Sequence, residues 1–208
     1  MQLEVHHTYR STAHLLDKQP TQFSPQHPMT KITTERLVLR SFVEADIPAI
    51  VHLLSVPDIA KTTLNVPYPY DEEKAREWLD MQKRERNAGK SHTFAITQRQ
   101  DGALLGAIDI RPNQRHRKAE VGYWIGKPYW GQGYATEALQ AIIRYGFEKL
   151  EMNRIYAMHF IGNPASGRVM QKAGMVFEGT LRQDVRKGDE FRDQRIYAIL
   201  HQDWTGVS

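Results

Sequence analysis

The spacing of hydrophobic residues predicts alternating strands and helices from residue 36 onward. Alternation of apolar and polar positions predicts strands over residues 36–42, 92–98, 103–111, 118–126, 154–160, 175–185 and 190–200. Recurrence every three or four residues predicts helices over residues 44–55, 71–89, 134–150 and about 164–173. The resulting order, β-α-α-β-β-β-α-β-α-β-β, indicates a mixed sheet with one central β-α-β crossover and no internal repeat.

Turn and cap residues mark the boundaries of these elements. The Asp-Gly pair at 101–102 lies between two alternating runs and is typical of a β-hairpin, and the RKGD segment at 186–189 predicts a second hairpin. Asp71, or the residue just before it, is expected to cap the second helix, and Gly89 to end it.

The first 29 residues differ from the rest of the chain. They contain three prolines, many polar residues and no sustained periodicity, so we expect residues 1–29 to form a flexible N-terminal extension and residues 30–208 to form one domain. A regulatory arm, an oligomer contact and a misplaced start codon all remain open as explanations for the extension.

Composition narrows the class of protein. A chain of 208 residues with 40% hydrophobic residues can bury one substantial core. Its formal net charge of +4 suits an anionic ligand but lacks the clustered basicity of a nucleic-acid binder. The chain has no cysteine, which excludes disulfides, thiolate zinc ligands and thiol nucleophiles. No apolar run is long enough to span a membrane and no secretion signal is recognisable, so we expect a soluble cytoplasmic protein.

A glycine-rich turn precedes the helix predicted to start at Tyr134. Gly131 and Gly133 lie in the stretch YWGQGYATEA, directly before the apolar-periodic run of that helix. Unpaired N–H groups and the helix macrodipole make such an N-terminus a site for anions, and glycine lets a phosphate approach the backbone closely. A turn with a purely structural role is the alternative, since the pattern is neither a Walker loop nor a complete dinucleotide fingerprint.

Four motifs together resemble the GNAT superfamily of N-acetyltransferases, and within it the RimJ/RimL-like branch. They are TERLVLR at 34–40, EVGYWIG at 120–126, WGQGYATEA at 130–138 and NPASGRVMQKAG at 163–174, and the resemblance covers about residues 31–204. It implies an α+β GNAT fold with a central, mostly antiparallel sheet whose fourth and fifth strands splay apart. It also implies transfer of an acetyl group from acetyl-CoA to a primary amine, above all to a protein N-terminal α-amine.

The resemblance assigns cofactor contacts to individual residues. Backbone amides for the CoA pyrophosphate fall on Gly131, Gln132, Gly133, Tyr134, Ala135 and Thr136, and strand-like contacts to pantetheine fall on Tyr123, Trp124 and Ile125. Asn163 is implied to contact pantetheine, Ser166 to lie near the thioester sulfur, and Lys172 to reach a CoA phosphate or the ribose. Trp130 occupies a position where the wider family carries glutamine or arginine.

The expected reaction needs a neutral amine, an oxyanion donor and a hydrogen-bond donor for the leaving sulfur. At pH 7 an α-amine loses its proton at a cost of about 1.4 kcal/mol, whereas lysine requires about 4.6 kcal/mol. Glu120 is our preferred base, and Glu178 is the reserve. Pairing of Glu120 with Arg117 or another cation is the structural alternative, as helix capping is for Ser166.

Other residues receive weaker expectations. The backbone N–H near Ile125 is a candidate oxyanion donor, His159 is expected to be structural, and the histidines show no metal spacing. The charge run at 111–118 is either a solvated loop or a contact to an acidic surface such as ribosomal RNA. The aromatic segment at 65–73 either frames the acceptor or serves packing.

Competing functions remain open from the sequence alone. An acetyltransferase for a small amine such as a polyamine, amino sugar or antibiotic is the rival within enzymes, and a silent CoA-binding sensor or an RNA-binding protein are the rivals outside them. We expect no membrane partner, and no nucleic-acid partner except through docking to a ribosome. Homodimers are frequent in the RimJ/RimL-like branch, so the resemblance also allows a homodimer.

Overall fold

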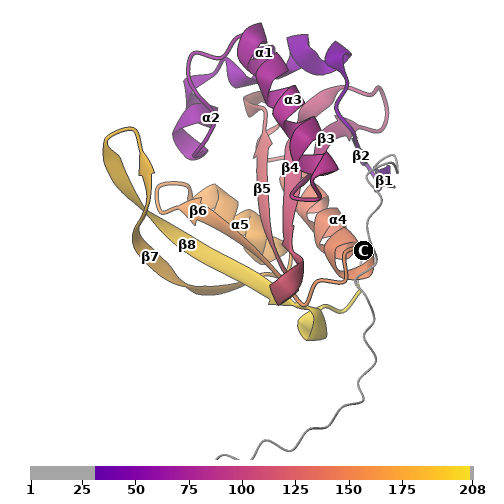
Figure 1. Cartoon of the computed structure of the whole chain (residues 1–208), viewed down its shortest axis with the longest axis vertical. Coiled ribbons are helices and arrows are strands. Elements are labelled where there is room, and N and C mark those ends of the chain that lie inside the picture. The colour runs from indigo at the N-terminus through magenta and orange to yellow at the C-terminus, as the bar shows by residue number, and fades with distance from the viewer. Residues whose placement is uncertain (1–30, 207–208) are drawn as a thin grey trace, which may run out of the picture.

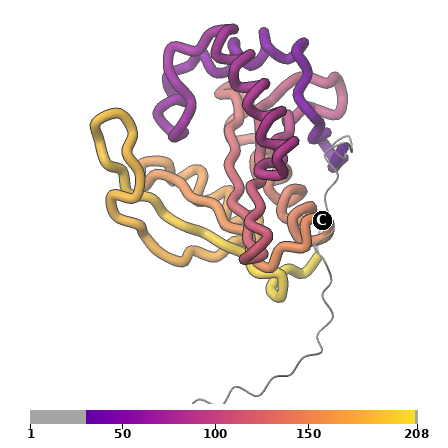
Figure 2. The backbone as a smooth tube through the Cα atoms, viewed as in Figure 1, coloured from indigo at the N-terminus to yellow at the C-terminus, as the bar shows by residue number. Residues whose placement is uncertain are grey.

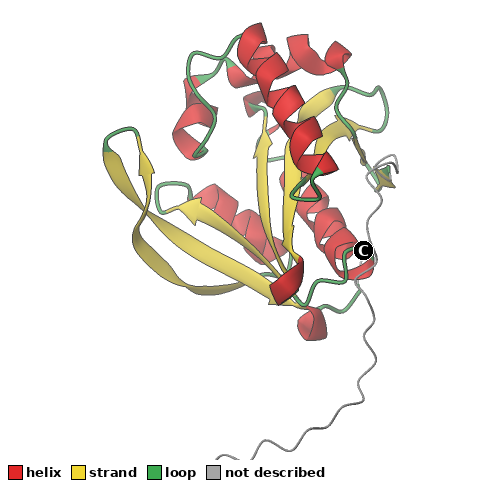
Figure 3. Ribbon diagram, in the orientation of Figure 1, coloured by secondary structure: helices red, strands yellow, loops and turns green. Residues whose placement is uncertain are grey.

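The computed structural model describes residues 31–206, and the predicted extension at 1–29 lies outside them. The strands are β1 (Ile32–Thr33), β2 (Leu37–Arg40), β3 (His92–Gln98), β4 (Leu104–Asn113), β5 (Lys118–Ile125), β6 (Arg154–Phe160), β7 (Val176–Lys187) and β8 (Glu190–Leu200). The helices are α1 (Ile47–Leu54), α2 (Pro57–Thr62), α3 (Glu72–Asn87), α4 (Tyr134–Glu148) and α5 (Pro164–Lys172), as Figures 1 and 3 show.

One mixed sheet organises the described residues. Its strand order is β1-β2-β3-β4-β5-β6-β8-β7, and every neighbouring pair is antiparallel except β5 and β6. Helix α4 connects β5 to β6 and makes the β-α-β crossover that the element order predicts. The predicted mixed, mostly antiparallel α+β fold is therefore confirmed.

Strands β5 and β6 part halfway along their length. Their parallel pairing runs from Lys118 with Arg154 to Val121 with Ala157. Beyond this point β5 continues to pair with β4 as far as Ile125, while β6 continues beside β8. Figure 2 shows the two strands diverging. They are the fourth and fifth of the predicted strands, because the two-residue β1 was not predicted. The sheet therefore opens between the strands for which the resemblance predicted a splay.

The two faces of the sheet are covered by different helices. Alternating side chains of β3 separate the faces, since Phe94 and Ile96 belong to the core under α4 and α5, while Ala95 belongs to the core under α1 and α3. In β5, Val121 and Ile125 pack toward α4, and Trp124 packs toward α1 and α3. A side chain's position along β5 therefore decides on which side of the opening it lies.

Several local predictions are confirmed. The Asp71 side chain accepts a hydrogen bond from the Lys74 N–H at 3.0 Å and caps α3, and Gly89 follows the end of that helix with a φ of +67°. Both predicted hairpins form, and β8 follows β7 directly along the chain. None of the helices in residues 31–206 is long and apolar enough to cross a membrane.

Two elements are absent from the sequence-based prediction. Strand β1 has two residues and helix α2 has six, so neither is long enough to establish a periodicity. Helix α2 begins at Pro57, a residue that favours a helix start but equally marks a loop. The sequence therefore predicted a continuous connection where the structure has a helical turn.

Candidate active site

A cavity of about 1250 Å³ occupies the opening between β5 and β6. Helices α4 and α5 border it on one side of the sheet, and α3 with residues 62–67 borders it on the other. Of the residues predicted from the sequence, it is lined by Glu120, Tyr123, Trp124, Ile125, Gly131, Gly133, Tyr134, Ala135, Thr136, Asn163, Ser166 and Lys172. The sheet opening thus brings together side chains from segments far apart in the chain.

The glycine turn requires its two glycines for backbone conformation. Gly131 and Gly133 have φ values of +76° and +84°, a left-handed region that other residues seldom adopt. Gly133 is the N-cap of α4 and offers no side chain to the first N–H groups of the helix. These N–H groups lie at the cavity wall, where an anion is the partner that fits them.

The predicted residue Gln132 differs from its neighbours because it is outside the cavity lining. Its side-chain amide donates to the Pro128 carbonyl at 3.0 Å, and its own carbonyl accepts from Arg36 Nη1 at 2.9 Å. Arg36 also lies over the Tyr134 ring, with 4.7 Å between Cζ and the ring centroid. The turn is therefore held from outside the cavity by a residue of the TERLVLR motif.

Trp130 joins the turn to the end of β5. Its indole Nε1 donates to the Ile125 carbonyl at 2.6 Å. A shorter or purely aliphatic side chain would leave this strand-end carbonyl without that donor. The departure from the wider family at this position thus has a structural role.

The edge of β5 toward β6 is available for pairing beyond Val121. Gly126 donates to Leu105 in β4, and antiparallel pairs exchange hydrogen bonds at every second residue. The backbone N–H groups of Tyr123 and Ile125 consequently face the opening, where the β5–β6 ladder has ended. An extended ligand can hydrogen-bond there as an added strand does, and the Ile125 N–H, the predicted oxyanion donor, is one of the groups that face the opening.

Two hydroxyl groups meet at the start of α5. The Tyr123 hydroxyl lies 2.7 Å from Ser166 Oγ and donates to the Ser166 carbonyl at 3.2 Å. Burial raises the pKa of Tyr123 to about 12, so its proton stays on the phenol at neutral pH. The cap of α5 is Asn163, whose side chain accepts from the Ser166 N–H at 3.4 Å. The Ser166 hydroxyl is therefore free of the capping role that was its structural alternative.

Carboxylates lie on the α3 side of the cavity. Glu120 accepts from the Tyr156 hydroxyl at 3.5 Å and lies 4.0 Å from Arg111 Nη1. Arg111 Nη2 is also 2.7 Å from Oδ2 of Asp109. Glu120 thus does pair with a cation, and that cation is Arg111 rather than Arg117, which donates to the Glu151 carbonyl.

The reserve candidate Glu178 lies away from this group. It accepts two hydrogen bonds from the Arg154 guanidinium, one of them at 2.6 Å, and these lower its pKa. It is not part of the cavity lining. A carboxylate engaged in this way has neither the position nor the basicity that a proton acceptor at the opening needs.

His159 and Lys172 are the remaining residues for which the sequence predicted a role. His159 is buried, its Nδ1–H donates to the Phe160 carbonyl at 2.7 Å, and burial lowers its pKa. It packs against Gly167, where a Cβ would meet Nε2 at 2.7 Å, so the neutral ring fits a structural role. Lys172 lines the cavity at the end of α5. Within residues 31–206 no group of three or more histidine, aspartate or glutamate residues is arranged to hold a metal ion.

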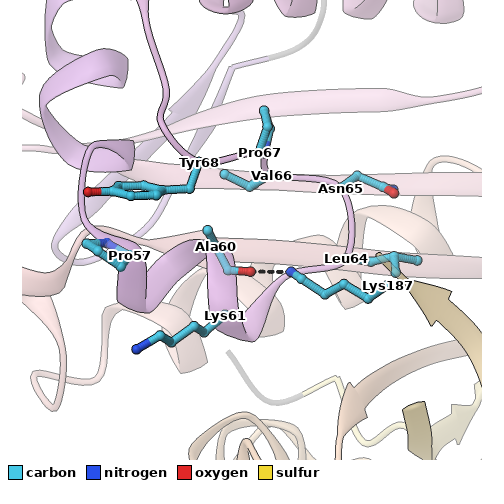
Figure 4. Close-up of a pocket in the computed structure, with 9 residues that line it drawn as sticks. All are labelled: Pro57, Ala60, Lys61, Leu64, Asn65, Val66, Pro67, Tyr68 and Lys187. Carbon is cyan, nitrogen blue, oxygen red and sulfur yellow. Dashed lines mark hydrogen bonds between the residues drawn. The ribbon is translucent and has the colours of Figure 1, made fainter. Parts of the chain in front are cut away.

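A lysine joins the β7–β8 hairpin to the end of α2. The Lys187 ammonium, near the tip of the β7–β8 hairpin, donates to the carbonyls of Ala60 and Thr63 at the end of α2. Figure 4 shows Lys187 reaching Ala60 beside a second groove of about 450 Å³. The groove and the main cavity share the lining residues Leu64 to Pro67, so both border the same segment. Within the segment 65–73, Asn65 to Pro67 and Tyr70 line the main cavity, while Tyr70 is also buried in the core under α1 and α3.

Sequence reasoning missed two charged residues of the cavity: Asp109, and Arg111 as an individual residue. Asp109 left a signal, because it is one carboxylate inside the otherwise apolar run ALLGAIDI. A charged residue at an inward position of a central strand requires a compensating reason. In the sequence, Arg111 is one of several charged residues in the run 111–118. Its pairing with Glu120 depends on strand register, which cannot be read from the sequence.

The chain is similar to known acetyltransferases. Residues 36–176 match the acetyltransferase (GNAT) domain family. An uncharacterized N-acetyltransferase of Bacillus subtilis, YnaD, is 34% identical over 174 residues, which cover 83% of this chain and 98% of the relative. The ribosomal-protein-serine acetyltransferase of Escherichia coli is 33% identical over 98 residues, or 47% of this chain and 55% of that protein. A crystal structure of a GNAT-family acetyltransferase from Bacillus anthracis has a TM-score of 0.74 at 30% identity and covers 83% of this chain and 99% of its own.

Proposed function

Because the chain belongs to the GNAT family of acetyltransferases, we propose that its acceptor is the α-amine at the N-terminus of a protein or peptide. Membership of this family shows that the chain is an acetyl-CoA-dependent N-acetyltransferase with acetyl-CoA as its co-substrate. The identity of the amine that accepts the acetyl group is our inference.

The observation that supports this choice is a second groove next to the cavity. The groove and the cavity are both lined by Leu64 to Pro67, and the groove is also lined by Pro57 and Tyr68 (Figure 4). A small amine has no atoms to fill a groove of about 450 Å³ outside the reaction centre. A polypeptide does, because the residues after its terminal amine continue outward along an extended path.

The name of one relative supports this choice. The relative from Escherichia coli is named as acting on a ribosomal protein, and it matches this chain over residues that make up about half of either protein. We infer a ribosomal or other cytoplasmic protein as the acceptor, and we expect the enzyme to act in the cytoplasm, where such proteins meet acetyl-CoA.

The energetics of deprotonation favour the same acceptor. At pH 7 an α-amine reaches its neutral, nucleophilic form for about 1.4 kcal/mol, about 3 kcal/mol less than a lysine side chain. A carboxylate base is strong enough to deprotonate an α-amine. Glu120, which the sequence predicted as the base, lies on the carboxylate side of the cavity together with Asp109.

The other side of the cavity fits acetyl-CoA. The left-handed glycines at 131 and 133 and the uncapped start of α4 form a cradle of N–H donors suited to a pyrophosphate. We propose that Gly131, Gly133, Tyr134, Ala135 and Thr136 hold this group, with Gln132 supporting the turn from outside. The open edge of β5 at Tyr123 to Ile125 would receive the pantetheine arm, with Asn163, Ser166 and Lys172 as further contacts.

A panel of acceptors tests the proposal. Release of free thiol from acetyl-CoA is measured with peptides that have a free N-terminus, the same peptides with an acetylated N-terminus and one lysine, and polyamines, amino sugars and aminoglycosides. Calorimetry follows CoA binding in parallel. We expect turnover with the free N-terminal peptides and at least tenfold less with the blocked ones.

Two results would contradict this proposal. Turnover with a small amine but not with peptides would give the enzyme a different acceptor class. CoA binding without turnover across the whole panel would move the protein to the silent-sensor function.

A further inference from the structure

Asp109 lies at the point where the sheet opens. It pairs with Gly122 across the antiparallel β4–β5 ladder, and paired residues share one face of a sheet. A Cβ atom added to Gly122 would lie 2.7 Å from Asp109 Oδ1, so the carboxylate occupies the space above this glycine. Gly122 directly follows Val121, the last residue of β5 that pairs with β6. The Asp109 carboxylate is therefore beside the first residue past the end of the ladder.

Glu120 lies further from the opening. It is two residues before Gly122 and pairs with Arg111 on one side and Tyr156 on the other, within the part of the sheet where β5 and β6 are still joined. Its carboxylate is also engaged by the Tyr156 hydroxyl and faces Arg111. Of the two carboxylates, Asp109 is the one placed where a ligand extended along Tyr123 to Ile125 would end.

We propose that Asp109 is the general base that takes the proton from the acceptor amine. The proposal rests on the function proposed above and assigns its proton-transfer step to a residue that the sequence did not single out. Arg111 acts as a positioning residue, because its guanidinium lies 2.7 Å from Asp109 Oδ2 and 4.0 Å from Glu120 Oε1. Oδ2 is buried on the Arg111 side, so an ammonium group in the cavity would approach the partly exposed remainder of the Asp109 carboxylate.

Asp109 takes one proton from the ammonium group of the acceptor, and the neutral nitrogen attacks the thioester carbonyl. The C–N bond forms, the C–S bond breaks, and the sulfur leaves with the electron pair. The second proton lost by the nitrogen restores the thiol, with the Tyr123 and Ser166 hydroxyl pair as hydrogen-bond donors at the sulfur. Asp109 then releases its proton to solvent, which completes one acetyl transfer.

The electrostatics of the site suit this role. Burial raises the pKa of Asp109 to about 6, with Arg111 opposing the rise and Glu120 adding to it. The titratable groups that line the cavity besides Asp109, Arg111, Glu120 and Tyr123 are Lys74, Glu77, Asp80 and Arg84 of α3, Tyr134 of α4, His159 of β6, Arg168 and Lys172 of α5, Asp184 of β7, and Tyr70 and Tyr129. A base with this pKa is about nine-tenths ionised at pH 7 and still holds a proton more firmly than an exposed carboxylate.

The test compares near-isosteric variants at both carboxylates. The kcat at saturating N-terminal peptide is measured from pH 5 to pH 8.5 for the wild type, Asp109→Asn and Glu120→Gln, with acetyl-CoA affinity followed by calorimetry. We expect Asp109→Asn to lower kcat about 100-fold, to replace the acid-side fall at about pH 6 with one that follows deprotonation of the amine itself at about pH 8, and to leave acetyl-CoA affinity within twofold. Glu120→Gln should retain the acid limb and lose less than tenfold.

A third variant tests position instead of charge. Gly122→Ala places a methyl group where the Asp109 carboxylate lies, so it should lower kcat at least tenfold while the carboxylate remains in the chain. An unchanged pH profile in Asp109→Asn, or a shift of the acid limb toward the amine's own pKa in Glu120→Gln, would overturn the assignment and leave the proposed function standing. Absence of wild-type turnover with every amine would overturn both.

Discussion

Arg36 and Glu137 are 101 residues apart in the chain, and their side chains meet at 2.7 Å between Nε and Oε2. The Arg36 backbone N–H donates to the other carboxylate oxygen at 2.8 Å, and the Thr34 hydroxyl donates to the same oxygen at 2.6 Å. These contacts join the start of β2 to the first turn of α4. The TERLVLR motif therefore has a structural task, which is to fix the helix start that carries the glycine cradle.

Removing the Arg36 side chain should weaken acetyl-CoA binding. Arg36→Ala deletes the hydrogen bond to the Gln132 carbonyl and the contact with Tyr134, so the turn loses its outer support. We expect Kd for acetyl-CoA to rise about tenfold, or about 1.4 kcal/mol, as measured by calorimetry. Arg76→Ala is the control, because it removes the same charge from an exposed pair with Glu72 on α3. Equal losses in both variants would indicate a general charge effect and contradict the positioning role.

The glycine cradle predicts a separation between stability and binding. Gly133→Ala and Gly102→Ala both place a side chain on a left-handed backbone, with φ values of +84° and +76°, and each should lose about 1–2 kcal/mol of unfolding free energy. Gly102 lies in the β3–β4 hairpin, away from the cavity. Only Gly133→Ala should also weaken acetyl-CoA binding, because its Cβ would press on Arg36 Nη2 at 3.3 Å. Thermal unfolding and calorimetry on both variants measure the two effects, and matching affinities would rule out the cradle.

Much of the fold could be predicted because its signals are local. Seven of the strands and the four longer helices have enough residues to establish a period, and Asp71 and Gly89 mark the ends of α3 by their own chemistry. The glycine turn was recognisable for the same reason. Asp109 and its pairing with Gly122 were not, because strand register and the end of the β5–β6 ladder depend on tertiary contacts. The bridge from Lys187 to α2 joins residues more than 120 positions apart and has no local signal.

The hydroxyl pair at the start of α5 should contribute to departure of the thiolate. Ser166→Ala and Tyr123→Phe each remove one partner of the 2.7 Å contact, and each should lower kcat by about 10-fold to 100-fold with little change in acetyl-CoA affinity. If the two hydroxyls act as a unit, the double variant should be little worse than the more affected single variant. The measurement is single-turnover thiol release. Additive losses in the double variant would instead mean that the two hydroxyls act independently.

The Lys187 bridge should affect the acceptor and not the cofactor. Lys187→Ala frees the β7–β8 hairpin from the carbonyls of Ala60 and Thr63, which loosens the wall shared with the second groove. We expect KM for an N-terminal peptide to rise threefold to tenfold, and Kd for acetyl-CoA to remain unchanged. Arg186→Ala, its neighbour paired with Asp189, is the control and should leave both values near wild type. A change in acetyl-CoA affinity in Lys187→Ala would contradict this separation.

Asp109 should make the folded chain less stable as the pH rises. Its pKa is raised by burial from 3.8 to about 6, so the folded state binds this proton more tightly than the unfolded state, and stability falls as the pH increases from about 4 through 6. Asp109→Asn removes the buried charge, so above pH 6 the variant should unfold at a higher urea concentration than the wild type. Its free energy of unfolding should be greater by up to about 3 kcal/mol, and this difference should vanish near pH 4.

Glu178→Gln is the control of opposite sign, because hydrogen bonds from Arg154 lower the pKa of Glu178 and stabilise the folded state above its ordinary pKa. That variant should be less stable than wild type at pH 7 and should approach it as the pH falls. If Asp109→Asn is no more stable than wild type at pH 7.5 in urea unfolding, the Asp109 carboxylate is not held at an energetic cost, and its pKa is not raised by burial.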